Sequence, residues 1–242
     1  MTLHRSRVPE LMDAEDLDPA THDAALRGLA RLNRASRSDA ILWPGLRRLA
    51  RATDRTLRVL DVATGSGDLP VALDARARRE GIRLEWVLCD RSPQALANAQ
   101  LAARKHAMRC TLTRVNVLRE PLPTGCDVVI SSLFLHHMDR AEVVQLLGAM
   151  REAAGMAIGV ADLDRTRLGL CMAWMGAHAL TRSPIVHFDA VASVRAAHAR
   201  AEIEQMARDA GLHGCTVDRA WPQRWRLWWH RAPGTCRSSA AT

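Results

Sequence analysis

The most informative segment of this 242-residue sequence is Leu57-Arg-Val-Leu-Asp-Val-Ala-Thr-Gly-Ser-Gly-Asp-Leu-Pro-Val-Ala-Leu73. Residues 57–61 are mostly apolar and predict a buried strand, which ends at the carboxylate of Asp61. A turn of small residues follows, and Pro70 then falls in the first turn of a helix, where a missing N–H costs little. Strand, glycine turn and helix together predict a doubly wound α/β sheet, whose ligands bind at the carboxyl ends of the strands.

The glycine turn itself limits the kind of ligand. A P-loop requires Gly-Lys-Ser/Thr, and this turn contains no lysine. A dinucleotide fingerprint requires a third glycine where this chain has Pro70. The remaining pattern is an acid followed by Gly-x-Gly, here Asp61, Gly65 and Gly67. Glycine at the last two positions lets a ligand approach main-chain amides that a Cβ atom would shield.

Polar residues also follow the next two predicted strands. Residues 84–90 predict a second strand that ends at Asp90, 29 residues after Asp61. A carboxylate at this position can accept hydrogen bonds from both hydroxyls of a ribose. A third strand over 108–117 brings Asn116 and Val117 to the same edge, where they could contact an adenine ring. For Asn116 a role in a strand-end turn is equally consistent with the sequence.

The remaining patterns complete an α/β domain with additions at both ends. Residues 126–133 and 156–162 predict strands, 199–210 a helix, and 216–231 two short strands around Trp221-Pro222. Asp139 with Glu142 predicts a capping box at the start of a helix. Helical patterns begin at Asp18 and over 41–49, where Pro44 is expected to kink or end the first turn. We therefore expect a helical lid or edge cap over 1–52, a sheet domain over 53–232 with an apolar helical insertion at about 166–198, and a disordered tail over 233–242.

Composition narrows the class of protein. The net charge of +8 and the pI of about 10.3 would suit an anionic partner, but all but one of the 34 basic residues are arginine, and they are scattered. Nucleic acid is therefore not the expected partner. The six cysteines form no C-x-x-C pair, which favours buried thiols in the cytoplasm. The N-terminus lacks the apolar core of a signal peptide, and the apolar segment 168–180 is too short to cross a bilayer.

Four motifs in order, Asp61–Gly67, Asp90, Asn116-Val117 and Ser131–His137, resemble class I S-adenosylmethionine-dependent methyltransferases of the group that includes ubiquinone and menaquinone biosynthesis enzymes. The segments Glu10–Asp13, Arg31–Arg34, Ala161–Arg165 and Leu180–Ser183 look similar to a narrower bacterial set associated with type III polyketide synthases. The resemblance implies a Rossmann-like, seven-stranded, mostly parallel sheet. It also implies that S-adenosylmethionine is bound by Asp61, Ala63, Thr64, Gly65, Gly67, Asp90, Arg91, Asn116, Val117, Ser131 and Leu133. Ala63 and Asn116 depart from the residues common in the family, and Asp164 replaces a histidine of the narrower set.

The implied reaction is O- or C-methylation of a small, apolar phenolic, polyketide or quinone-like acceptor. The chain contains no tyrosine, so His136 and His137 are the candidate bases after the fourth strand, although such a pair could also only shape its loop. Met172, Trp174 and Met175 could wall an apolar acceptor pocket or simply form core. No metal site is expected. An RNA methyltransferase and a non-catalytic S-adenosylmethionine-binding protein remain as alternatives, and the oligomeric state is open.

Overall fold

The computed structural model describes residues 3–11, 18, 21, 24, 25, 28, 31, 32 and 38–232. Its strands are β1 (Leu57–Val62), β2 (Leu84–Asp90), β3 (Cys110–Arg114), β4 (Cys126–Ser132), β5 (Ala154–Leu163), β6 (Thr216–Ala220) and β7 (Arg224–His230). Its helices are α2 (Ser38–Arg51), α3 (Asp68–Arg79), α4 (Pro93–Lys105), the short 3₁₀ helix η2 (Leu135–His137), α5 (Arg140–Ala153), α6 (Arg167–Leu180), α7 (Pro184–Ala196) and α8 (Arg200–Asp209).

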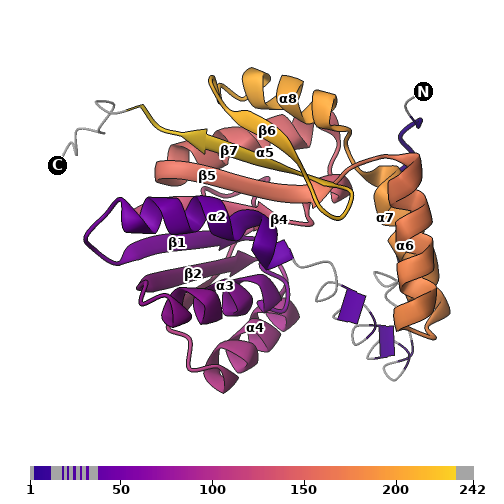
Figure 1. Cartoon of the computed structure of the whole chain (residues 1–242), viewed down its shortest axis with the longest axis horizontal. Coiled ribbons are helices and arrows are strands. Elements are labelled where there is room, and N and C mark those ends of the chain that lie inside the picture. The colour runs from indigo at the N-terminus through magenta and orange to yellow at the C-terminus, as the bar shows by residue number, and fades with distance from the viewer. Residues whose placement is uncertain are drawn as a thin grey trace.

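All seven strands belong to one sheet, in the order β3-β2-β1-β4-β5-β7-β6. The first five strands run parallel, and β7 is antiparallel to both of its neighbours, β5 and β6. This arrangement confirms the predicted Rossmann-like, mostly parallel sheet. The carboxyl ends of the parallel strands meet at one edge, where α6, α7 and the N-terminal segment lie (Figure 1). The candidate ligand-binding residues of four separate strands are thereby brought to one side of the molecule.

Two hydrophobic clusters cover the two faces of the sheet. One cluster joins the sheet to α5 and α8, and the other joins it to α2, α3 and α4. Helix α2 buries Ile41, Leu42 and Leu46 in the second cluster. Within the region 1–52 that was predicted as a lid or edge cap, α2 packs against the sheet at β5 and β7, with α3 beside it.

Close packing of one tryptophan holds α2 against the sheet. Trp228 of β7 lies opposite Gly159 of β5 and beneath Gly45 of α2. A Cβ atom on Gly45 would come within 2.3 Å of the indole, and one on Gly159 within 2.7 Å. Both glycines are therefore required by volume, because the ring fills the space that their side chains would occupy.

Several element boundaries differ from those expected. The third strand is confined to Cys110–Arg114, so Asn116 and Val117 lie in the loop beyond it. Helix α2 continues through Pro44 and does not end there. The insertion contains two helices, α6 and α7, which pack on each other. The predicted capping box at Asp139 is confirmed, and Ser92 caps the start of α4. The tail over 233–242 lies outside the described residues, and no described helix is long and apolar enough to cross a membrane.

Candidate cofactor and acceptor site

The glycine turn after β1 leaves open space above its backbone. Ala63, Gly65 and Gly67 all have positive φ angles, of 57°, 55° and 76°. A Cβ atom added to Gly65 would meet no atom within 4 Å, whereas one on Gly67 would lie 3.2 Å from Ala99 of α4. Gly65 therefore faces space that a ligand could fill. Gly67 has no side chain, and this lets the start of α3 pack closely against Ala99 of α4. This is the fit expected of a turn that wraps a cofactor.

Asp61 lies almost wholly buried at the end of β1. Its carboxylate accepts one hydrogen bond from the hydroxyl of Thr64, at 2.7 Å. Burial raises the pKa of this carboxyl to about 7, and the nearby charge of Asp90 adds to the rise while the Thr64 hydroxyl opposes it. A buried acid with so little compensation is poised to pair with a cationic group, such as the ammonium of an amino acid.

Asp90 occupies the end of the neighbouring strand and is tied to the same turn. One carboxylate oxygen accepts from the amide of Gly65 at 3.0 Å, and the other from the amide of Ser92 at 2.9 Å. These two bonds fix the carboxylate plane and leave lone pairs on both oxygens for vicinal hydroxyls. Arg91 follows on the exposed side of the strand end, where its carbonyl accepts from Arg114.

The structure places the other predicted cofactor residues, Asn116, Val117, Leu133 and Ser131, in different surroundings. The carboxamide oxygen of Asn116 accepts from the amide of Leu118 at 3.2 Å, so this side chain builds a turn, and Val117 is buried beside it. Leu133, with φ 54°, is half-buried and borders the acceptor cavity described below. Ser131 differs from the expectation: its hydroxyl is fully buried and donates to the carbonyl of Val62 at 3.0 Å. It joins β4 to β1 from within the sheet and has no surface open to a ligand.

Beyond the glycine turn lies a cavity of about 340 Å³ between η2, α6, α7 and the β6–β7 turn. Its walls are mainly apolar, and its polar lining is concentrated in a few side chains. The lining residues are Glu10, Leu32, Leu133, His136, His137, Leu163, Gly169, Met172, Ala173, Gly176, Leu180, Ala190, Ser193, Val194, Pro222, Gln223 and Arg224. The cavity therefore has the character of a site for a small, largely apolar molecule with a polar end.

His136 is the best-positioned ionisable group of this cavity. It is 5% exposed, and its Nδ1 lies 2.8 Å from a carboxylate oxygen of Asp162 on β5. The same carboxylate accepts from the amide of His136 at 3.2 Å. Burial by itself would lower the pKa of His136, but the charge and hydrogen bond of Asp162 and the charge of Glu10 raise it above its ordinary value, against the opposing charge of Arg224.

His137 stands differently from its neighbour. The two ring centroids lie 4.1 Å apart with the ring planes tilted by 37°, and His137 is exposed at the cavity rim. Desolvation by its surroundings and the charge of His136 lower the pKa of His137 to about 4. The structure thus separates two histidines that the sequence treats alike: one is held by a carboxylate inside the cavity, and the other covers its edge.

The N-terminal segment 3–11 is hydrogen-bonded to the turn that carries both histidines, residues 136–138, which is called the histidine turn below. Arg5 donates to the carbonyl of Met138 at 2.7 Å and to that of His136 at 3.2 Å, and Arg7 donates to that of His137 at 2.8 Å. The segment also brings Glu10 to within 3.8 Å of His136 Nε2. This segment belongs to the region predicted as a lid or edge cap, and its Glu10 lines the cavity.

Three charged residues around His136 were not chosen from the sequence: Glu10 and Arg224 line the cavity, and Asp162 binds His136 from β5. Asp162 ends a strand at the same edge as Asp61 and Asp90, and this common position was the signal that could have identified it. Glu10, His136 and His137 bring possible metal-ligand atoms within 4.8 Å of one another. In this group Asp162 binds Nδ1 of His136, the Ser193 hydroxyl donates to Glu10, and Nε2 of His136 faces the Glu10 carboxylate.

The predicted acceptor residues are not brought together. Met172 lines the cavity. Trp174 and Met175 are each about half exposed and do not contribute to the cavity wall. Trp174 is rotated by about 200° from Met172 and points to the opposite side of α6, whereas Met175 is rotated by about 60° and lies on the flank of the helix away from the cavity.

Comparison with known proteins agrees with this geometry. Residues 59–154 match a family model described as a methyltransferase domain. These residues are therefore similar to a methyltransferase domain. The matched segment includes Asp61, both turn glycines, Asp90 and the histidine pair, and the match supports S-adenosylmethionine as the cofactor of the domain. No curated protein sequence matches the chain.

Solved structures show the same fold around this methyltransferase domain. The S-adenosylmethionine-dependent methyltransferase SibL in its apo form is 22% identical, with a TM-score of 0.68 over 93% of this chain and 63% of its own. Magnesium protoporphyrin IX methyltransferase from Synechocystis PCC 6803 is 16% identical, with a TM-score of 0.58 over 91% of both chains. An O-methyltransferase family 2 protein from Planctomyces limnophilus DSM 3776, in complex with apigenin, is 16% identical, with a TM-score of 0.60 over 90% of this chain and 63% of its own. The chain thus spans under two thirds of the length of two of these proteins.

Proposed function

We propose that this protein transfers a methyl group from S-adenosylmethionine to a hydroxyl group of a small, apolar phenolic or quinone-like acceptor. The observation that carries the proposal is His136, which is buried at the wall of an apolar cavity and bonded through Nδ1 to Asp162. Asp61, Gly65, Gly67 and Asp90 would hold the cofactor at the adjacent strand ends. When bound, the cofactor supplies the electrophilic methyl group.

The protein groups would then orient the acceptor and take its proton. The carboxylate of Asp162 keeps the Nδ1–H tautomer of a neutral His136, so that the lone pair lies on Nε2. Nε2 would accept the hydroxyl proton as the acceptor oxygen attacks the methyl carbon, and the His136–Asp162 pair would carry the resulting charge. Aligning the two reactants inside the cavity would supply the rest of the acceleration.

The class of acceptor rests on the cavity and on resemblance. A volume of about 340 Å³ with apolar walls suits one or two rings better than a polymer. Among the proteins of similar fold, one is described in complex with apigenin. The resemblance to ubiquinone-type and polyketide-associated enzymes favours a quinone precursor or a phenolic polyketide. Methylation at carbon remains the alternative outcome, and it would also use a base beside the ring.

The experiment is a product assay with purified protein, S-adenosylmethionine and a panel of phenols, hydroquinones and polyketide-like resorcinols, read by mass spectrometry. We expect a product heavier by one methyl group, and a turnover about a hundredfold lower in His136→Ala. His137→Ala should fall much less, because this ring does not reach the Asp162 carboxylate. EDTA should leave turnover unchanged. A His136→Ala variant with wild-type turnover would remove the base from the mechanism.

The same assay distinguishes the alternatives. Methyl incorporation into bulk RNA and into no small acceptor would identify an RNA methyltransferase. Binding of S-adenosylmethionine by calorimetry without any product would identify a protein that only binds the cofactor. No heat with S-adenosylmethionine or with its demethylated product, on folded protein, would refute the proposal at its base.

A further inference from the structure

The outer face of the α6–α7 pair is unusually apolar for a surface. Leu168, Trp174 and Met175 of α6 are 54%, 53% and 49% exposed, and Phe188 of α7 is 44% exposed. Leu168 and Met175 lie seven residues apart and so share one face of the helix, with Trp174 beside them. Both helices stand at the right-hand edge of the molecule in Figure 1, away from the sheet. Several large apolar side chains exposed on one surface are typical of a site that binds a protein, a ligand or a membrane.

The two helices present this face as one unit. The ring of Trp174 lies 4.5 Å from that of His178, which stacks at 3.8 Å on His187 of α7. The second stack is nearly parallel, at an interplanar angle of 19°. Beneath it, Ala177 of α6 packs in a small core with Ile185 and Val186 of α7. The apolar face, defined here as Leu168, Trp174, Met175 and Phe188, is therefore supported from below.

Charge on the same helices has a single sign. Within the described residues of α6, α7 and the link between them, the exposed basic side chains are Arg167, Arg182, Arg195 and His178. The one acidic residue, Asp189, is buried and accepts from the amide of Leu11 at 2.7 Å. The surface of an anionic lipid bilayer has charged headgroups above an apolar interior. An apolar face with nearby arginines and no exposed acid on these helices is complementary to such a surface.

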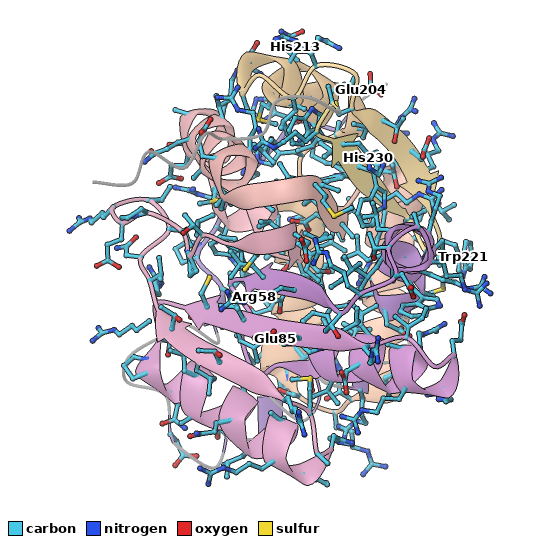
Figure 2. The ribbon with its side chains drawn as sticks, turned by 90° about the vertical axis from the view of Figure 1, so that its left-hand side faces the viewer. Arg58, Glu85, Glu204, His213, Trp221 and His230 are labelled. Atoms are coloured by element: carbon cyan, nitrogen blue, oxygen red, sulfur yellow. The ribbon has the colours of Figure 1, made fainter. Side chains whose placement is uncertain are left out.

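The inner face of α6 belongs to the acceptor cavity. Gly169, Met172 and Gly176 line it, and Leu180 both lines the cavity and is 37% exposed. The β6–β7 turn reaches the start of α6, where Gln223 accepts from the Thr166 hydroxyl at 2.7 Å. From that turn Trp221 projects into solvent with 76% of its surface exposed (Figure 2). One helix therefore separates the apolar face from the cavity that receives the acceptor.

We propose that the α6–α7 face binds the surface of an anionic lipid bilayer, and that an apolar acceptor reaches the cavity from that bilayer. Tryptophan, leucine and phenylalanine would enter the headgroup boundary, while Arg167 and Arg182 contact lipid phosphates. A second copy of the chain fits less well, because a symmetric contact would bring the same arginines together without an exposed acid on the face to pair with them. The route of the acceptor rests on the proposed function, whereas bilayer binding does not.

The test is co-sedimentation of the full chain with vesicles of phosphatidylcholine, alone or with 30% phosphatidylglycerol, at about physiological salt. We expect binding to the anionic vesicles and at least tenfold weaker binding to the neutral ones. The double variant Trp174→Ser/Phe188→Ser should lose binding by tenfold or more, while Leu101→Ser, at an equally exposed leucine of α4, should not. Arg167→Gln/Arg182→Gln should lose about tenfold, and Arg104→Gln on α4 should lose less.

Several results would overturn the inference. One is that the wild-type protein does not bind anionic vesicles. Another is that the variants of the apolar face are folded by circular dichroism and bind as tightly as the wild type. Light scattering that shows a dimer dissociated by Trp174→Ser/Phe188→Ser would assign the face to a second copy. Because vesicle binding is measured without cofactor or acceptor, its failure leaves methyl transfer intact, and a failed methyltransferase assay leaves vesicle binding to be judged separately.

Discussion

At the residue scale, the site depends on carboxylates that perform different tasks at one sheet edge. Asp61 is buried with a single hydroxyl partner, whereas Asp90 is fixed by two amides and remains accessible. Asp162 is buried against His136, which, after the opposing effect of burial, lowers the pKa of Asp162 and keeps it ionised. The same residue type thus supports a histidine at Asp162, and under the proposed function it would pair with a cation at Asp61 and accept hydroxyl hydrogen bonds at Asp90.

Asp61→Asn tests the first of these tasks. The folded pKa of about 7 lies above the unfolded value, so the native state of the wild type holds a proton that the unfolded chain releases, and stability should fall as pH rises from about 4 to 7. The asparagine side chain does not ionise, so the stability of the variant should not fall with pH for this reason. Its melting temperature should therefore exceed that of the wild type at pH 8 and approach it at pH 4, while calorimetry shows cofactor affinity reduced by tenfold or more. A variant that is less stable than the wild type at pH 8 would contradict this account.

Asp162→Asn tests the support of His136. The groups that face His136 are Asp162, Glu10, Arg224 and His137, and Asp162 is the main one that raises its pKa. Removing that charge should move the acidic limb of the pH dependence of kcat/KM to lower pH, because His136 then loses its proton more easily. The plateau should also fall by about a hundredfold, since the amide no longer selects the Nδ1–H tautomer. Asp164→Asn, which does not contact His136, serves as the control and should keep the wild-type profile.

At the element scale, helix α2 and the insertion show how sequence patterns and packing differ in what they specify. The strand, capping and turn signals located β1, β2, β4 and α5 closely, because each depends on neighbouring residues. Whether α2 forms a lid or a layer of the sheet domain depends on a partner about 180 residues away, Trp228. The outward direction of Trp174 and Met175 depends likewise on which face of α6 meets α7.

Gly45→Ala tests the contact between α2 and the sheet. A methyl group there would overlap the Trp228 ring, and relief of such overpacking costs about 1–3 kcal/mol. In a domain of this size we expect the melting temperature to fall by about 3–10 °C. Gly148→Ala on α5, where a Cβ atom would meet nothing within 4 Å, should be neutral or stabilising, because alanine favours helix. Thermal denaturation followed by circular dichroism measures both, and equal melting temperatures in the two variants would contradict the packing account.

At the scale of the whole molecule, the net charge of +8 needs an explanation that does not require nucleic acid. Many arginines are used inside the structure. Arg165 bonds to Glu202 and to the carbonyls of Leu3 and Ala197, and Arg5 bonds to three carbonyls of the histidine turn and α7. Arginine suits this task because its fork of donors can bind several carbonyl oxygens at once. Part of the positive charge is therefore structural.

This account predicts weak and unspecific binding of RNA. Total RNA should bind with micromolar or weaker affinity at low salt, and binding should fall steeply as salt rises to 200 mM. Labelled methyl groups should not enter RNA under conditions where a phenolic acceptor is methylated. Filter binding over a salt series, with a matched methyl-incorporation assay, measures both. Binding to one RNA that persists at 200 mM salt would contradict the prediction.

The sequence by itself determined the α/β class, most of the strand positions, and the sheet edge at which Asp61, Gly65, Gly67 and Asp90 lie together. These features follow from local rules: apolar runs make strands, and parallel strands bring their carboxyl ends to one side. Only the tertiary structure decided that His136 lies inside the cavity with Asp162 and Glu10, that His137 stays at the rim, that Ser131 is internal, and that Trp174 faces outward. Those outcomes depend on contacts between residues far apart in the chain, which spacing along the sequence does not encode.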